Sequence, residues 1–157
     1  VPQGAMRYGE VLLKRGQPRA AAVQYRAAIN MDPDFIPALL ALARLSERHD
    51  GEQSPLFWLD KAVSRAPRQG LGYYARGLYK VRQGQYELAL SDLAKAAELE
   101  PTNEDWQYTY AVALENMGRA DEAIGHLHSV LQNENNQPRL RQLLQLYRQK
   151  YGMNYGM

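Results

Sequence analysis

The stretch from Gly70 to Pro101 reads GLGYYARGLYKVRQGQYELALSDLAKAAELEP, and the same pattern of small and chain-breaking residues lies on either side of it. Five of its positions, two glycines, two alanines and a proline, recur earlier in the chain at one constant offset, as Gly9, Gly16, Ala21, Ala28 and Pro33. Half of this offset is the even interval that separates Pro33, Pro67 and Pro101. Self-similarity with a period of about 34 residues is typical of stacked helical pairs.

Each unit is predicted to fold as a helical hairpin. In the quoted stretch one apolar stripe at helical spacing comprises Leu71, Tyr74, Leu78 and Val81. A second stripe follows Gly84 and comprises Leu88, Leu90, Leu93, Ala96, Ala97 and Leu99. Gly84 suits the left-handed position that ends the first helix, and Pro101 stops the second. Gly77, Ala89 and Ala96 have almost no side chain, so the paired helices can approach closely there.

The predicted fold class is all-α, with four hairpins at residues 3–34, 36–67, 70–101 and 104–134. Residues 138–150 form one more amphipathic helix, whose apolar face comprises Leu140, Leu143, Leu144 and Tyr147. This helix is predicted to cap the array, because the last hairpin of a solenoid otherwise leaves an apolar face open to water. We therefore predict a single domain over residues 1–157.

The second unit departs from the pattern. The position of the turn glycine is occupied by Asp50, and Pro55 falls where the second helix should contain a small residue. Proline inside a helix costs about 3 kcal/mol. This helix is therefore predicted to begin at Pro55 with Ser54 as its N-cap, after a longer loop over residues 49–53. Asp34 and Asn103 are predicted to cap the first helices of the second and fourth units.

Composition limits the classes of partner. The formal net charge is +2 and the pI is about 8.8, which is mild for a nucleic-acid-binding protein. The positive excess is assigned to Arg139, Arg141, Arg148 and Lys150 near the end of the chain. Without cysteine, the chain has neither disulfides nor thiolate catalysis. No apolar run approaches the length of about 20 residues that a membrane helix needs, so we predict a soluble protein without membrane insertion.

The search for catalytic chemistry favours no site. His126 and His128 are two positions apart on a predicted helix and point in divergent directions, so they are interpreted as solvated surface histidines. The glycines have neither dinucleotide-binding nor P-loop spacing. The carboxylates Glu47, Asp92, Glu98 and Glu122 are expected on outer faces. We therefore predict a protein that is not an enzyme and has no cofactor and no metal site.

The order of Tyr, Leu, Gly, Ala and Pro over nearly the whole chain resembles the tetratricopeptide repeat. This resemblance implies a right-handed superhelical solenoid with a partner-binding groove lined by the first helix of each repeat. The family's variable groove positions correspond here to Met6, Glu10, Leu40, Arg44, Arg48, Tyr74, Leu78, Arg82, Tyr108, Val112 and Glu115. The wider set also contains Leu13, Lys14, Glu47, Leu71, Val81, Asp105 and Asn116.

The implied groove combines tyrosines and aliphatic residues with a rim of arginines and acids. Such a lining suits an amphipathic helix or an extended segment of a partner protein. Members of the family that hold the C-terminal carboxylate of a chaperone do so with lysine, asparagine and arginine. The corresponding positions here are Met6, Glu10, Ala41, Leu71 and Ala75, which contain no such group. A chaperone-tail adaptor is therefore disfavoured.

Two phrases, LLKRGQPRAAAVQYRAAINMDPDF and WQYTYAVALENMGRADEAI, also resemble tetratricopeptide tails of bacterial extracytoplasmic multihaem cytochrome-like proteins. This second resemblance favours the bacterial periplasm over the cytoplasm. The leading hypothesis is a noncatalytic protein-protein interaction module that binds a peptide or helix in its concave groove. The alternative is a structural, self-associating domain of a larger bacterial assembly or cytochrome-like protein, which would make the chain a homo-oligomer.

Overall fold

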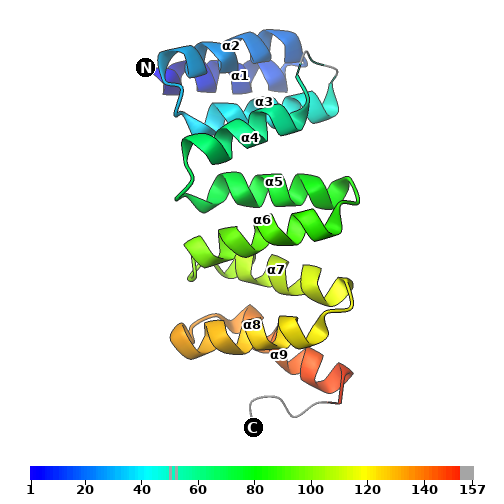
Figure 1. The fold of residues 1–157 in the computed structure, drawn as a ribbon. Coiled ribbons are helices and arrows are strands. Elements are labelled where there is room, and N and C mark those ends of the chain that lie inside the picture. The colour runs from blue at the N-terminus through cyan, green and yellow to red at the C-terminus, as the bar shows by residue number, and fades with distance from the viewer. Residues whose placement is uncertain (50, 52, 153–157) are drawn as a thin grey trace. The chain divides into compact units, whose positions relative to one another are not determined.

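The computed structural model describes residues 1–49, 51 and 53–152, and every regular element in these residues is an α-helix. The helices form hairpins in chain order, followed by a single C-terminal helix (Figure 1). The chain divides into two compact units, Val1–Arg76 and Gly77–Met157, and the boundary lies inside α5 (Gly70–Arg82). The predicted all-α hairpin fold is confirmed. The prediction of a single domain stays a prediction.

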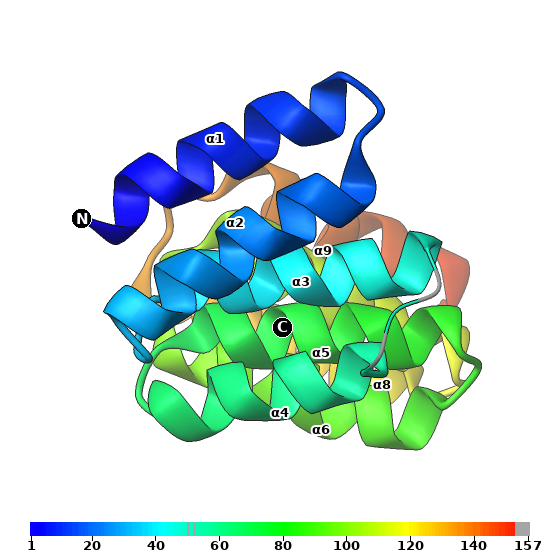
Figure 2. The same ribbon diagram turned by 90° about the horizontal axis from the view of Figure 1, so that it is seen from above.

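The first unit contains two complete hairpins. Helix α1 (Pro2–Lys14) pairs with α2 (Pro18–Met31) (Figure 2), and α3 (Ile36–Arg48) pairs with α4 (Pro55–Arg65) (Figure 1). Helix α2 also packs against α3. The shared core comprises Leu12, Ala21, Tyr25, Ala28, Ala38, Ala41, Leu42 and Leu45.

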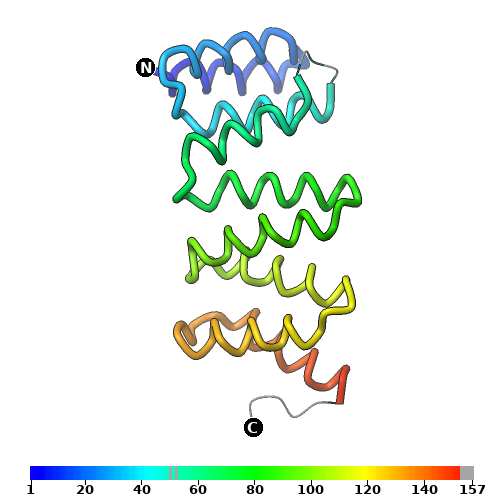
Figure 3. Tube along the Cα trace, in the orientation of Figure 1, coloured from blue at the N-terminus to red at the C-terminus, as the bar shows by residue number. Residues whose placement is uncertain are grey.

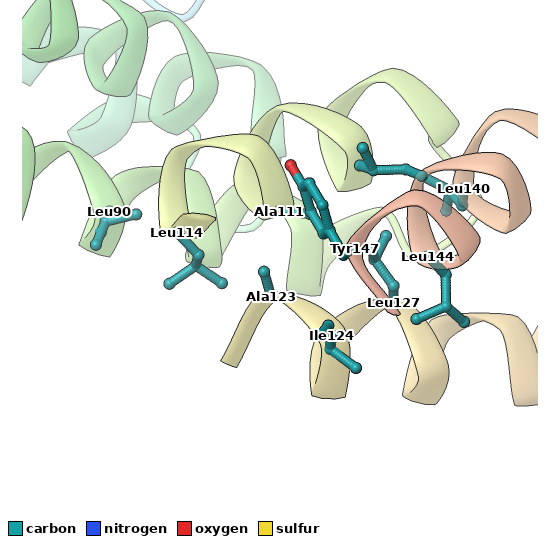
Figure 4. Packing of buried hydrophobic residues seen from close by; sticks show 10 residues of the cluster. Leu90, Ala111, Leu114, Ala123, Ile124, Leu127, Leu140, Leu144 and Tyr147 are labelled. Carbon is teal, nitrogen blue, oxygen red and sulfur yellow. The ribbon is translucent and has the colours of Figure 1, made fainter. Parts of the chain in front are cut away.

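The second unit contains the later part of α5, then α6 (Tyr86–Leu99), α7 (Glu104–Asn116), α8 (Ala120–Asn133) and α9 (Pro138–Lys150). Helix α9 packs against both α7 and α8. Its four predicted apolar residues join the core of this unit, together with Leu90, Ala111, Leu114, Ala123, Ile124 and Leu127 (Figure 4). The predicted capping helix therefore covers the last hairpin.

Three of the four hairpins turn through a glycine. Gly16, Gly84 and Gly118 have φ of 75°, 77° and 77°, a backbone conformation that residues with a side chain adopt at a cost. After α5, Gln85 N donates to Lys80 O at 2.8 Å, and the amide of Gly84 donates to the carbonyl of residue 81 at 3.0 Å. This pair of bonds satisfies carbonyls that have no partner within the helix. The chain reverses in the same way after α1 and α7 (Figure 3).

The second hairpin has the different connection that its sequence predicts. Helix α3 ends at Arg48, and α4 begins at Pro55, with Ser54 Oγ accepting from Phe57 N at 3.4 Å. Residues 49, 51 and 53 lie outside both helices, while 50 and 52 fall outside the described residues. Asn103 also caps α7 as predicted, because its Oδ1 accepts from the amide of residue 106 at 3.2 Å.

The predicted N-cap at Asp34 is wrong. Helix α3 begins at Ile36, so the capping position belongs to Phe35, which makes no side-chain cap bond. Asp34 lies one residue too early for its carboxylate to serve the first amides of the helix. Its own amide instead donates to Asp32 Oδ1 at 3.0 Å, in a turn that precedes α3.

Close approach explains why small residues recur at a constant offset. A Cβ on Gly9 would lie 2.6 Å from Tyr25 Cε1, and one on Gly77 would lie 2.9 Å from Leu93 Cδ2. Tyr25 and Leu93 are related by the same offset as the two glycines, so the same contact forms once in each unit.

The predicted apolar stripe of α6 fails at Leu88, which is 58% exposed although an inward position was expected. None of the helices formed by the described residues is long and apolar enough to cross a membrane.

Candidate functional site

The first unit contains a hollow of about 430 Å³ between α1 and α3, which we name the N-terminal hollow. It brings together four of the predicted groove residues. Its lining comprises Met6, Glu10, Leu13, Lys14, Tyr25, Ala41, Arg44, Leu45, Arg48 and His49. Tyr25 is 2% exposed and contributes to the floor, whereas Glu10, Arg44 and Arg48 lie at the rim.

Positive charge dominates this rim. Lys14, Arg44 and Arg48 face a single carboxylate, that of Glu10, and none of the three cations forms an ion pair with another described residue. The pKa of Tyr25 is raised by burial and further by Glu10, while Arg44 acts in the opposite direction. The charges of Glu10 and Arg44 at the rim therefore change the pKa of Tyr25 on the floor of the hollow.

The second unit contains a hollow of about 480 Å³ between α5 and α7, backed by α6, which we name the C-terminal hollow. It brings together Leu78, Tyr108 and Val112, three of the predicted groove residues. The full lining comprises Leu78, Val81, Tyr86, Leu93, Tyr108, Thr109, Val112, Ala113, Asn116 and Met117. No residue of this lining is charged, so the walls of the C-terminal hollow are apolar with a few neutral polar groups.

Helix α9 lies next to the C-terminal hollow, and two of its cations contact residues of α7. The guanidinium of Arg139 lies 4.4 Å from the ring centroid of Tyr108, and Arg139 also pairs with Asp105. At the other end of α7, Glu115 Oε1 accepts from Lys150 Nζ and from Tyr151 Oη, each at 2.6 Å. The hydrogen bonds from Lys150 and then Tyr151 lower the pKa of Glu115. Glu115 is therefore engaged by the C-terminal helix and does not line the hollow.

Three further predicted groove residues line neither hollow. Leu40 is 9% exposed and belongs largely to the interior, and Tyr74 and Arg82 lie on α5 outside both linings. Conversely, the C-terminal hollow includes Tyr86 and Leu93, which the sequence reasoning missed. Both belong to α6, the second helix of its hairpin, whereas the prediction considered first helices only. The signal for Leu93 is the apolar stripe of that second helix, which does not include Tyr86.

Gln107 and His126 form a partly buried polar cluster between α7 and α8. Gln107 is 0% exposed, and its Nε2 donates to Ala97 O at 3.0 Å and to Glu100 O at 2.9 Å, at the end of α6. Its Oε1 can only accept, so His126 Nε2 donates to it at 2.8 Å. The imidazole also packs edge-on against Tyr110 at a centroid distance of 4.8 Å. The interpretation of His126 as a solvated histidine is wrong, because these contacts remove much of the ring from water.

This burial predicts an acid-sensitive fold. Desolvation lowers the pKa of His126 from 6.5 to about 4. Between these values the unfolded chain binds the extra proton and the folded chain does not, so stability falls as the pH drops from 6.5 towards 4. The full loss in the free energy of unfolding is about 3 kcal/mol. We expect urea midpoints, followed by circular dichroism, to fall over this window.

A matched pair of variants isolates the contribution of His126. In His126→Gln the loss of stability in acid should shrink, whereas His128→Gln, the same substitution two positions along α8, keeps His126 and should retain that loss. Carboxylates near the cluster, among them Glu98, Glu122 and Glu134, are present in both variants and cancel in the comparison. Equal pH dependence in the native protein and His126→Gln would contradict the assignment.

A second charged group departs from its predicted place. Asp92 was expected on an outer face, yet it is 4% exposed and accepts from Lys80 Nζ at 2.8 Å. The Cβ of Asp92 lies next to Gly77, whose missing Cβ leaves room for Leu93 and Asp92 of α6. Among the residues that the structure describes, no three of the types His, Cys, Asp and Glu are grouped so as to hold a metal ion.

Comparison with known proteins agrees with this geometry. Residues 80–147, from the end of α5 through most of α9, match the tetratricopeptide repeat family. No curated protein matches the sequence at a significant level.

Solved structures with a similar fold match most of the chain. A crystal structure of MamA is 21% identical, covering 92% of this chain and 84% of that one, with a TM-score of 0.68. PilF of Pseudomonas aeruginosa is 22% identical, with coverage of 96% and 68% and a TM-score of 0.71. MamA of Desulfovibrio magneticus RS-1 is 20% identical, with coverage of 87% and 77% and a TM-score of 0.65. At these identities the likeness establishes the fold.

Proposed function

We propose that this tetratricopeptide repeat protein is a noncatalytic interaction module and that a peptide or helix of a partner protein docks in the C-terminal hollow. The family belongs to the class of protein-interaction scaffolds, which supports the general function. The observation that supports the specific site is the hollow of about 480 Å³ with a lining free of charged residues. An open apolar depression of this size suits an aromatic or aliphatic anchor residue.

The chemistry of the lining defines how the anchor is held. Leu78, Val81 and Val112 contribute apolar walls, and Tyr108 contributes a ring that is held in place by the guanidinium of Arg139. Thr109 and Asn116 add neutral polar groups for a partner's backbone. Burial of an anchor side chain there would contribute most of the docking free energy, because apolar area removed from water is the dominant favourable term.

The test has two stages. A photo-crosslinking amino acid is placed at Val112, inside the hollow, and in a second protein at Leu88, which is 58% exposed and does not line it. We expect a partner to crosslink at Val112 and not at Leu88. The crosslinked segment is identified by mass spectrometry and synthesised as a labelled peptide.

Binding of that peptide is then measured by fluorescence anisotropy. The double variant Tyr108→Ala with Val112→Ala should lower the affinity about tenfold or more, as loss of a docking anchor does. Tyr8→Ala, an exposed tyrosine outside both hollows, is the matched control and should bind normally. Full affinity in the double variant with an unchanged unfolding midpoint would exclude the C-terminal hollow as the docking site.

A further inference from the structure

The two units carry opposite net charge, although the chain as a whole is nearly neutral. Residues 1–76 contain 11 Lys and Arg against 7 Asp and Glu, a net +4, and residues 77–157 contain 8 against 10, a net −2. The positive excess therefore lies in the first unit, which corrects its assignment to the end of the chain. Within the first unit, the rim of the N-terminal hollow concentrates this excess at an open surface.

We propose that the N-terminal hollow binds an acidic segment of a partner protein, with partner carboxylates paired to Arg44, Arg48 and Lys14. This inference rests on the proposed interaction function and adds the chemistry of the partner. The choice of an acidic segment rests on charge complementarity with the rim. Three rim cations face one carboxylate, that of Glu10, and none of the three is neutralised by another described residue.

The spacing of these cations suits an extended or helical segment. Arg44 and Arg48 lie one turn apart on α3, and Lys14 is at the end of α1 across the hollow. Between them the lining is apolar, from Met6 and Leu13. An occupant with carboxylates next to aliphatic residues satisfies both the rim and the floor. Arginine suits this role because its planar guanidinium binds carboxylates through two parallel hydrogen bonds.

The same hollow does not suit a nucleic acid. Proteins that bind single strands combine basic grooves with exposed aromatic rings on which bases stack. The only aromatic ring in this lining besides the imidazole of His49 is Tyr25, which is 2% exposed and packs against Gly9. The rim is thus cationic without a stacking platform.

The probe is a fluorescein-labelled acidic peptide that alternates pairs of glutamate with leucine, compared with the same peptide containing glutamine. We expect the glutamate peptide to bind about tenfold more tightly at low salt, and we expect this advantage to shrink as salt screens the charges. Amide shifts in NMR spectra should map the glutamate peptide to α1 and α3. Equal binding of the two peptides would overturn the proposal.

Three variants test the residues, and they change affinity in different directions. Arg44→Glu with Arg48→Glu should reduce binding about tenfold or more, whereas Glu10→Gln should increase it about twofold, since a repulsive carboxylate is lost. Arg7→Glu with Arg68→Glu makes the same charge change at exposed sites outside the hollow and should have little effect. An equal loss in both double variants would show a nonspecific charge effect and overturn the site.

Two rival occupants have their own outcomes. Tighter binding of a thymidine oligonucleotide with the same dependence on Arg44 and Arg48 would overturn the proposal in favour of a nucleic acid. Sedimentation that shows a dimer of the protein alone, dissociated by the Arg44 and Arg48 variants, would overturn it in favour of a second copy. Tyr108→Ala should leave the glutamate peptide bound, so failure of the C-terminal hollow remains distinguishable from failure here.

Discussion

Replacing Leu127 with alanine should destabilise the second unit by about 3 to 5 kcal/mol. Leu127 is 0% exposed, and it lies on α8 in the cluster that α9 closes from the other side (Figure 4). Truncation removes apolar burial and leaves a cavity between α8 and α9 that rigid neighbours fill only in part. Because α8 and α9 pack mainly against each other and against α7, the loss falls on the second unit.

The two tryptophans allow this effect to be assigned to its unit. Trp58 lies in the first unit and Trp106 in the second, so Trp58→Phe leaves a fluorescence probe of the second unit alone. In that background the urea midpoint reported by Trp106 should fall sharply in Leu127→Ala. Leu146→Ala is the matched control, because Leu146 is 55% exposed on α9 and its truncation should change the midpoint little. Equal midpoints in the two variants would contradict the capping role of α9.

Replacing Asp92 with alanine should lower the free energy of unfolding by about 3 kcal/mol, because the ammonium of Lys80 would lose the buried carboxylate with which it pairs. The side chains of this pair are only 15% and 6% exposed, and their atoms are 2.8 Å apart. Removal of one charge leaves the other desolvated without compensation. The measurement is again the Trp106 midpoint in the Trp58→Phe background.

A compensating double variant separates the lost charge pair from lost packing. Lys80→Met with Asp92→Leu replaces both charges with apolar groups and should recover most of the stability, since buried pairs are often exchanged for hydrophobic residues without loss. Glu98→Ala is the matched control on the same helix, because its pair with Lys95 is exposed and should contribute little. If the double variant is no more stable than Asp92→Ala, contacts of Asp92 other than the pair with Lys80 account for the effect instead.

Much of the candidate site could be predicted from repeat register. Met6, Glu10, Arg44 and Arg48 were expected to share a groove, and they do line one hollow. The same register wrongly placed Leu40, which is interior, because neighbouring residues cover the face of α3 on which it lies. Register assigns a residue to a face of its helix, but it does not say whether a neighbour covers that face.

The positions of the hairpins were determined by the sequence alone, because turns and helix crossings depend on local chemistry. Gly16, Gly84 and Gly118 close three turns since only glycine adopts positive φ without cost, and Ser54 starts α4 since proline cannot lie deeper in a helix. Gly9 is small because Tyr25 fills the space beside it.

Only the tertiary structure decided how the polar groups are used. His126 donates to Gln107, Asp92 is buried against Lys80, and Glu115 is held by α9 instead of facing a partner. Each of these outcomes depends on a residue from another helix, at a distance and depth that the spacing within one helix does not encode. Burial then changes the cost of a charge by several kcal/mol, so the same residue type becomes a surface group, a structural pair or a titrating site.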